Sequence, residues 1–213
     1  MLNVFARYRR KRKFGEDIII VSGLPRSGTS MMMKMLEAGG VAIMTDQVRT
    51  ADEDNPKGYF EVERVKDLDR EKDKSWVRAG RGKALKVISF LLKDLPSDNF
   101  YRVIFMHRDL DEVVVSQKKM LDRRGESSQT EDDRMKDLYR GHLVKVRLEI
   151  PARPNVEFLE LHYSRVVAEP RDAAERVKRF LGRPLDVDAM VAAVDKELYR
   201  NRKPSGAPGA ATR

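Results

Sequence analysis

An apolar run that leads into a glycine-bounded loop sets the strongest limit on the fold. Residues 18–21 read Ile-Ile-Ile-Val, and residues 23–30 read Gly-Leu-Pro-Arg-Ser-Gly-Thr-Ser. A strand that enters such a loop and continues into a helix presents backbone N–H groups to an anion, most often a phosphate. We therefore predict a strand at Ile18–Ser22, a helix from about Gly28 to Glu37, and an anion-binding loop between them.

The loop lacks the lysine that nucleotide-hydrolysing P-loops carry. In those loops Gly-x4-Gly is followed by Lys, which contacts the β- and γ-phosphates, and by a Ser or Thr that holds Mg²⁺. Thr29 stands at the lysine position here, and the cation is Arg26, inside the loop. A ligand would meet backbone N–H groups, a guanidinium and the hydroxyls of Thr29 and Ser30, a set that suits an anionic donor without a metal-bridged triphosphate. The alternative is an ordinary strand-to-helix turn in which the glycines serve geometry alone.

The composition favours one globular domain. The chain has 213 residues, of which 41% are hydrophobic and 36% are charged, and this length is enough to bury a sizeable core. The absence of cysteine excludes disulfides, thiolate metal sites and thiol catalysis, and the three histidines are spread along the chain. No apolar run approaches the roughly 18 residues of a membrane span, and no hydrophobic signal segment opens the chain. We therefore expect a cytoplasmic protein.

Three regions differ in composition. Residues 1–16 form a basic N-terminal arm that contains Arg-Tyr-Arg-Arg-Lys-Arg-Lys, residues 17–195 carry the alternating apolar pattern of a folded domain, and residues 196–213 are expected to be a flexible tail. The formal net charge is +9. This charge leaves three interpretations of the arm open: a solvated segment, a nucleic-acid-binding segment, or part of a field that attracts an anionic cofactor.

Predicted strands and helices alternate along the rest of the chain. The further strands are expected at Ala84–Ser89, Tyr101–His107 and Val156–Leu161, and the further helices at about 110–121, 131–149 and 170–182. This order predicts an α/β fold, a P-loop NTPase-like parallel sheet of about four to five strands flanked by helices. The ligand crevice of such a sheet lies at the carboxyl ends of the strands.

Two helices show clear apolar stripes, while one long segment shows no period. The first helix is expected to bury Met31, Met32, Met35 and Leu36. The helix at 131–149 is expected to bury Met135, Leu138, Tyr139, His142, Leu143 and Val146. Residues 42–82 are irregular and polar, which in a compact domain indicates a functional or flexible segment.

The loop resembles the 5′-phosphosulfate-binding loop of sulfotransferases, enzymes that move a sulfuryl group from 3′-phosphoadenosine 5′-phosphosulfate (PAPS) to an acceptor. Their loop usually reads Pro-Lys/Arg-Ser/Thr-Gly-Thr-Ser/Thr. By this resemblance Arg26 contacts the bridging oxygen and the sulfate, while Thr29 and Ser30 hold the 5′-phosphate. The matching residues, all expected to bind the cofactor, are Pro25, Arg26, Ser27, Gly28, Thr29 and Ser30.

A second motif resembles the 3′-phosphate site of the same family, where an arginine ends a strand and a serine follows eight residues later. Arg108 and Ser116 have this spacing. The resemblance implies that both bind the 3′-phosphate, the group that separates PAPS from ATP. Arginine offers a planar fork that fits phosphate. From the residues alone, Arg108 could instead pair with Asp109 or Asp111.

A third segment looks like the region of cytosolic sulfotransferases in which a lysine and, two residues later, a histidine precede an apolar run ending in Leu-Pro. Lys86 matches the lysine, which would polarise the transferring sulfuryl group, but Ile88 stands at the position of the histidine base. The acceptor must still lose a proton, so we expect a carboxylate to replace the histidine.

The irregular segment supplies the candidates for that base, namely Asp46, Asp52, Glu53, Glu61 and Glu63. We favour Glu61, because the run Gly-Tyr-Phe-Glu at 58–61 resembles an acceptor-side element of bacterial members. The alternative is that Glu61 is an ordinary surface carboxylate.

Two weaker similarities complete the resemblance, which covers most of residues 17–183. Tyr163 falls near a residue that approaches the adenine in relatives. Arg202 and Lys203 are similar to a late Arg-Lys-Gly that clasps the 3′-phosphate, although the spacing differs and a proline interrupts it.

Together these motifs predict a PAPS-dependent sulfotransferase that acts by metal-independent in-line transfer. Arg26, Lys86 and Glu61 are the expected catalytic residues, and the acceptor is expected to be a hydroxyl or amine of a small molecule or carbohydrate, not a nucleic acid. The identity of the acceptor and the oligomeric state stay open. The competing hypotheses are a P-loop small-molecule kinase with a degenerate loop and a non-catalytic module that binds polyanions.

Overall fold

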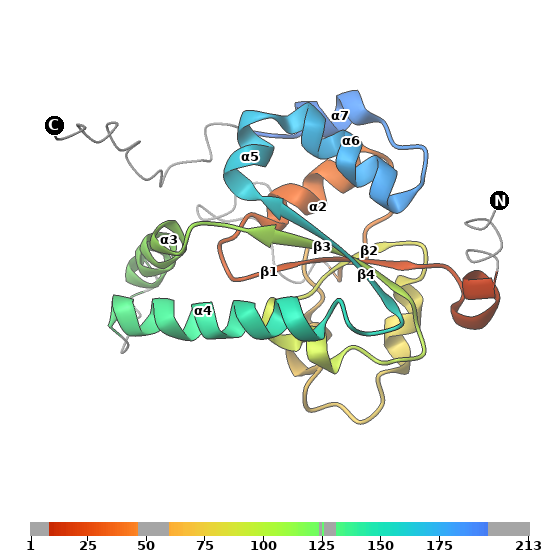
Figure 1. The fold of residues 1–213 in the computed structure, drawn as a ribbon, viewed down its shortest axis with the longest axis horizontal. Coiled ribbons are helices and arrows are strands. Elements are labelled where there is room, and N and C mark those ends of the chain that lie inside the picture. Colours follow the sequence, from red (N-terminus) through yellow and green to blue (C-terminus); the bar gives the residue numbers. More distant parts are fainter. Residues whose placement is uncertain (1–8, 47–59, 124, 126–130, 196–213) are drawn as a thin grey trace, which may run out of the picture.

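Four parallel strands form the centre of the molecule (Figure 1). The computed structural model describes residues 9–46, 60–123, 125 and 131–195. The strands are β1 (Ile18–Gly23), β2 (Ala84–Lys86), β3 (Tyr101–His107) and β4 (Val156–His162), and their order in the sheet is β2-β1-β3-β4. The prediction of an α/β fold with a parallel sheet of about four to five strands is confirmed, and the described sheet has four.

The central strand explains the direction of the loop that follows it. Every residue of β1 is buried, as expected for a parallel strand covered on both faces. Ile20 pairs with Leu85 on one side and with Val103 on the other. Because β1 lies between two neighbours, its end at Gly23 delivers the loop to the middle of the carboxyl edge of the sheet.

Helices cover both faces of the sheet (Figure 1). One face carries α2 (Thr29–Ala38), α5 (Tyr163–Ala168), α6 (Pro170–Leu181) and α7 (Val187–Ala192). The other carries α4 (Asp132–Glu149) and the 3₁₀ helices η1 (Glu63–Asp67), η2 (Ser75–Gly80) and η3 (Ser89–Asp94). The helix α3 (Leu110–Arg123) follows β3 at the carboxyl edge. Alternate side chains of β1 enter the two cores, Ile19 and Val21 on one face and Ile18 and Ile20 on the other.

The second strand is shorter than predicted. It ends at Lys86, because the chain turns into the 3₁₀ helix η3 at Ser89. The backbone N–H of Val87 still donates to the Val21 carbonyl (3.0 Å), whereas the N–H of Leu91 already donates to the Ile88 carbonyl (3.0 Å). The apolar run was therefore long enough for a strand, but its second half packs as a 3₁₀ turn.

Two further features differ from the sequence-based expectation. The short helices α5 and α7 were not predicted, and Leu138, expected in the core, is 60% exposed. The buried face of α4 consists of Tyr139, Leu143 and Val146, which are spaced by four and three residues. Leu138 lies outside this narrower stripe.

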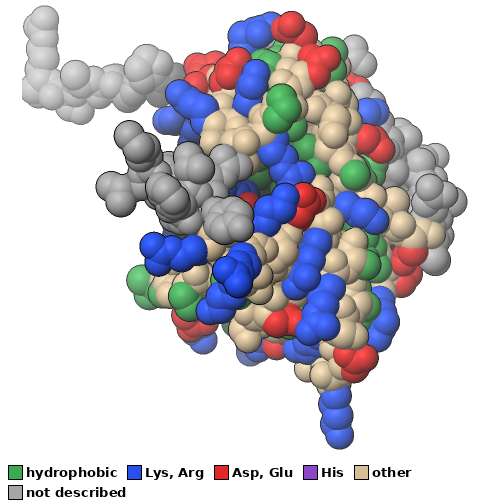
Figure 2. Space-filling model, turned by 90° about the vertical axis from the view of Figure 1, so that its right-hand side faces the viewer, with side chains coloured by type: hydrophobic (Ala, Val, Ile, Leu, Met, Phe, Trp, Pro, Cys, Tyr) green, Lys and Arg blue, Asp and Glu red, His purple; other side chains and the backbone are tan. Residues whose placement is uncertain are grey.

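The described part of the basic N-terminal segment is attached to the domain. Residues 9–14 are helical, and the Arg10 guanidinium donates to Asp17 (3.1 Å), forms an ion pair with Glu157 and lies 4.1 Å from the centroid of the Phe100 ring. Figure 2 faces this side of the molecule, and Lys and Arg side chains cover much of it. The positive charge is thus not confined to the carboxyl edge of the sheet.

Residues 1–8 and 196–213 lie outside the described residues, so the predicted boundaries of the arm, the domain and the tail stay predictions. Within the described residues, no helix combines the length and the apolar character needed to cross a membrane.

Candidate active site

The loop between β1 and α2 folds tightly over the end of the sheet. Arg26 and Gly28 have φ values of 67° and 97°, in the left-handed region, and the backbone N–H of Ser27 donates to the Leu24 carbonyl (3.2 Å). A Cβ at Gly23 would lie 2.5 Å from the carbonyl oxygen of Met106, so the loop begins in close contact with β3. Thr29 is the first residue of α2, so the loop leads directly to a helix N-terminus.

Two hydroxyl groups at the start of this loop are buried without a hydrogen-bond partner among the described residues. They are Ser22 Oγ and Ser27 Oγ. Buried polar atoms usually have partners, and exceptions are often found at functional sites. The exception at Ser27 fits a loop that binds a polar ligand.

Arg108 lies against the loop. Its Nη1 donates to the carbonyl oxygen of Arg26 (3.1 Å), and its Cζ lies 4.6 Å from the centroid of the Tyr163 ring. Its Nε donates to Glu112 Oε2 (2.9 Å), in an ion pair whose side chains are 8% and 6% exposed. The structure therefore brings together the loop after β1 and the arginine that follows β3, as the nucleotide-site hypothesis requires.

Glu112 is the site residue that the sequence analysis missed. From the sequence, Asp109 and Asp111 were the alternative partners of Arg108, but the buried ion pair is formed with Glu112, four residues after the arginine. The four-residue spacing of Arg108 and Glu112 was the available signal: Arg108 lies two residues before α3 begins at Leu110, and Glu112 lies in the first turn of that helix. Asp109 Oδ1 instead accepts from the backbone N–H of Asp111 (2.9 Å) at the start of α3.

Ser116 is buried one further turn along α3 and contacts the loop. Its Oγ accepts a hydrogen bond from Arg26 Nε (3.0 Å). The resemblance assigned Ser116 to the 3′-phosphate together with Arg108. The structure gives Ser116 a contact with the loop arginine, so α3 touches both cations of the predicted site.

Tyr163 packs on the loop glycine. A Cβ at Gly28 would lie 2.3 Å from Tyr163 Cδ2, so the ring occupies the space that any larger residue would need. Tyr163 is the first residue of α5, directly after β4, and it is buried. Its ring thus contacts both Gly28 and Arg108.

Lys86 lies at the end of β2, between α2 and the irregular segment. Its Nζ donates to Ser30 Oγ (3.3 Å) and forms an ion pair with Glu61 Oε1 (3.0 Å), and the two side chains are 15% and 20% exposed. The backbone positions Glu61, because its carbonyl accepts hydrogen bonds from Thr45 Oγ1 (2.9 Å) and Asp46 N (3.3 Å). The predicted lysine and the favoured carboxylate are therefore in direct contact.

Of the remaining candidates, the structure describes Glu63 and Asp46. Glu63 forms an exposed ion pair with Lys66, and Asp46 Oδ2 accepts from the backbone N–H of Glu63 (2.5 Å). Asp52, Glu53, Arg202 and Lys203 lie outside the described residues. Within the part of the chain that the structure describes, no group of three or more His, Asp or Glu side chains could hold a metal ion.

The comparisons with known proteins concern the family and the fold of the chain. Residues 83–187, about half of the chain, match the sulfotransferase family. No curated protein matches the chain in sequence. The chain belongs to the sulfotransferase family, a family of enzymes that use PAPS.

Solved structures of sulfotransferases share the fold. The sulfotransferase domain from the Synechococcus PCC 7002 olefin synthase is 15% identical, with a TM-score of 0.51 over 90% of this chain and 82% of that chain. Sulfotransferase STF1 from Mycobacterium tuberculosis H37Rv is 14% identical, with a TM-score of 0.51 over 90% and 74%. The sulfotransferase domain from the curacin biosynthetic pathway is 12% identical, with a TM-score of 0.50 over 90% and 93%.

Proposed function

We propose that the protein transfers a sulfuryl group from PAPS to a hydroxyl or amine of a small molecule or carbohydrate, without a metal ion. The observation that carries this proposal is the hydrogen bond from Arg108 Nη1 to the Arg26 carbonyl (3.1 Å). It places the candidate 3′-phosphate arginine beside the candidate 5′-phosphosulfate loop. A guanidinium on the other face of the sheet would have excluded a shared nucleotide.

The residues of the loop fit an anionic nucleotide. The left-handed Gly28, the N-terminus of α2 and the hydroxyls of Thr29 and Ser30 supply donors to a phosphate. Arg26 and Arg108 supply two positive charges. No residue of this loop provides the lysine of a nucleoside-triphosphate hydrolase.

Sulfuryl transfer forms a bond from the acceptor oxygen or nitrogen to sulfur and breaks the bond between sulfur and the bridging oxygen. The bridging oxygen gains negative charge, which Arg26, Lys86 and the loop N–H groups would stabilise. Donors fixed in advance toward such a charge contribute about 3–4 kcal/mol each to rate acceleration. Ser30 orients Lys86 through its hydroxyl.

In this proposal Glu61 is the base that removes the proton of the acceptor. A carboxylate has two oxygens with several lone pairs, so an ion pair through Oε1 is compatible with accepting a proton from a substrate. The same ion pair keeps the carboxylate next to Lys86, where the acceptor must attack. In this proposal Glu61 replaces the histidine that the family pattern puts at the position of Ile88.

Isothermal titration calorimetry with 3′-phosphoadenosine 5′-phosphate (PAP) and 5′-AMP tests the proposal. A charge-assisted contact to the 3′-phosphate predicts that PAP binds about tenfold or more tightly than 5′-AMP. Arg108→Ala removes this preference. Arg140→Ala, which breaks an exposed ion pair with Asp137 on α4, is the matched control and leaves the preference unchanged.

Equal affinities for PAP and 5′-AMP would contradict the proposal, because the 3′-phosphate site would then not exist. Tight binding of Mg²⁺-ATP with weak binding of PAP would favour a kinase.

A further inference from the structure

A buried carboxylate lies at the edge of an anion-binding site, where simple electrostatics would disfavour it. Glu112 is 6% exposed and contacts the arginine assigned to the 3′-phosphate. A negative charge there repels a phosphate, and its burial is costly unless it is paired. The residue therefore needs a role that outweighs this repulsion.

The contacts of Arg108 point to that role. The guanidinium plane is restrained along its edge by two acceptors, Glu112 Oε2 at Nε (2.9 Å) and the Arg26 carbonyl at Nη1 (3.1 Å). Its face packs on the Tyr163 ring, with Cζ 4.6 Å from the centroid. Contacts to two different nitrogens and to the face define both the position and the tilt of a planar group.

Glu112 is also part of a regular arrangement on α3. Glu112 and Ser116 are four residues apart and lie on one face of the helix. Glu112 contacts Arg108, and Ser116 Oγ accepts from Arg26 Nε (3.0 Å). The first two turns of α3 thus hold two guanidinium groups, one for each end of the nucleotide.

We propose that Glu112 is a positioning residue, which orients the Arg108 guanidinium so that it recognises the 3′-phosphate of the donor. This inference rests on the proposed function. The carboxylate acts through the hydrogen bond at Nε, and the preference for PAP over 5′-AMP depends on that bond. A purely structural role would affect the two nucleotides equally, since they differ only in the 3′-phosphate.

Calorimetry on three variants, Glu112→Ala, Glu112→Gln and Glu112→Asp, tests this role at one fixed salt concentration. The alanine variant loses the acceptor, so the preference for PAP falls about tenfold while the affinity for 5′-AMP stays within about threefold. The glutamine variant keeps an acceptor oxygen at the same reach, so the preference stays within about threefold of the wild type. The aspartate variant keeps the charge but withdraws the carboxylate by about 1.5 Å, so its preference lies below that of the glutamine variant.

Asp137→Ala is the matched control. It removes the carboxylate of an exposed ion pair with Arg140 on α4 and leaves both affinities unchanged. If Glu112→Ala does not fold, the difference in PAP preference between the glutamine and aspartate variants tests the positioning role without it.

Three results would overturn the inference while the proposed function stands. They are a retained preference in Glu112→Ala, an equal loss of PAP and 5′-AMP affinity in that variant, and a stronger preference in the aspartate than in the glutamine variant. A wild-type protein without any preference for PAP would overturn both.

Discussion

At the scale of single residues, the contact between Lys86 and Glu61 has the most direct chemical meaning. Lys86 Nζ lies 3.0 Å from Glu61 Oε1 and 3.3 Å from Ser30 Oγ, so one ammonium group joins the loop helix to the candidate base. Both side chains are largely buried, and a positive charge in such an environment acts more strongly than in water. In the proposed function this pair takes part in the transfer step.

We predict that Lys86→Gln lowers kcat about 100-fold and changes the affinity for PAP less than about threefold, because the ammonium acts on charge that develops only during transfer. Glu61→Gln lowers kcat by about 100-fold or more, because it removes the base. Transfer from sulfur-labelled PAPS to an acceptor found by screening hydroxyl and amine compounds measures both effects.

Lys66→Gln serves as the control for that measurement, since Lys66 forms an exposed pair with Glu63 on the surface. A Glu61→Gln enzyme with the wild-type rate would show that another group removes the proton.

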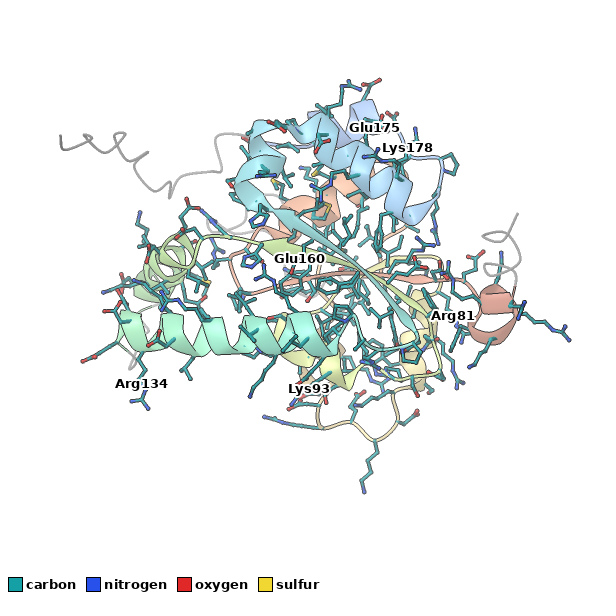
Figure 3. The ribbon with its side chains drawn as sticks, in the orientation of Figure 1. Arg81, Lys93, Arg134, Glu160, Glu175 and Lys178 are labelled. Atoms are coloured by element: carbon teal, nitrogen blue, oxygen red, sulfur yellow. The ribbon has the colours of Figure 1, made fainter. Side chains whose placement is uncertain are left out.

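At the scale of elements, α4 contains a glycine that its local structure does not require. Gly141 lies inside an 18-residue helix, and a Cβ added there would meet no atom within 4 Å. Arg134, two turns earlier on the same side, points away from the molecule in Figure 3. Glycine inside a helix costs about 0.5–1 kcal/mol relative to alanine, because it loses more backbone entropy on folding.

Gly141→Ala is therefore expected to raise the free energy of unfolding by about 0.5–1 kcal/mol, measured by urea denaturation.

Gly28→Ala is expected to lower the free energy of unfolding in the same measurement, because Gly28 has a φ of 97° and an added Cβ would lie 2.3 Å from the Tyr163 ring. Its cost is about 1–2 kcal/mol from the backbone conformation alone. A stabilised Gly28→Ala protein would show that the loop can relax away from Tyr163.

At the scale of the whole molecule, two histidines link stability to pH. Burial lowers the pKa of His107, and Arg147 and His162 lower it further, against the opposing effect of Glu160. Figure 3 shows Glu160 on β4, and Arg147 of α4 forms an ion pair with it (2.7 Å). Burial also lowers the pKa of His142, with contributions from Lys145 and Lys93, and its Nε2 lies 2.9 Å from Ser89 Oγ.

We predict that the protein loses stability as the pH falls from about 7.5 to 5.5. In this window the histidines of the unfolded chain, whose pKa values are about 6.5, bind protons more readily than those of the folded protein, whose pKa values are lowered. The free energy of unfolding cannot change by more than about 1.4 kcal/mol per pH unit for each proton that is taken up on unfolding. Urea denaturation at both pH values measures the change.

The double variant His107→Gln, His142→Gln isolates this effect and should show a smaller difference between the two pH values. Carboxylates titrate mainly below about pH 5 and so contribute little in this window. An unchanged pH dependence in the double variant would contradict the assignment to these two residues.

Much of the fold could be predicted because most strands and helices show their pattern within one contiguous segment of sequence. The third strand is a nearly continuous apolar run, and the fourth keeps four apolar residues around Glu157 and Glu160. The helix α6 begins at Pro170 and ends before Gly182, which has the left-handed φ of a helix C-cap. The six-residue helices α5 and α7 were missed because so few residues show no helical period. The end of β2 was misplaced because an apolar run does not distinguish a strand from a 3₁₀ turn.

The sequence by itself determined the parallel α/β fold, the glycine-bounded loop between β1 and α2 and the types of charged residue available to it, since these follow from local patterns. Only the tertiary structure decided which of those charges meet. Lys86 and Glu61 are 25 residues apart and Arg26 and Arg108 are 82 apart, and their contacts depend on how β1, β2 and β3 are ordered in the sheet. The ion pair of Arg108 with Glu112 likewise depends on packing. The sequence spacing permits this pair, and the contacts of Arg108 with the Arg26 carbonyl and the Tyr163 ring fix the guanidinium in place.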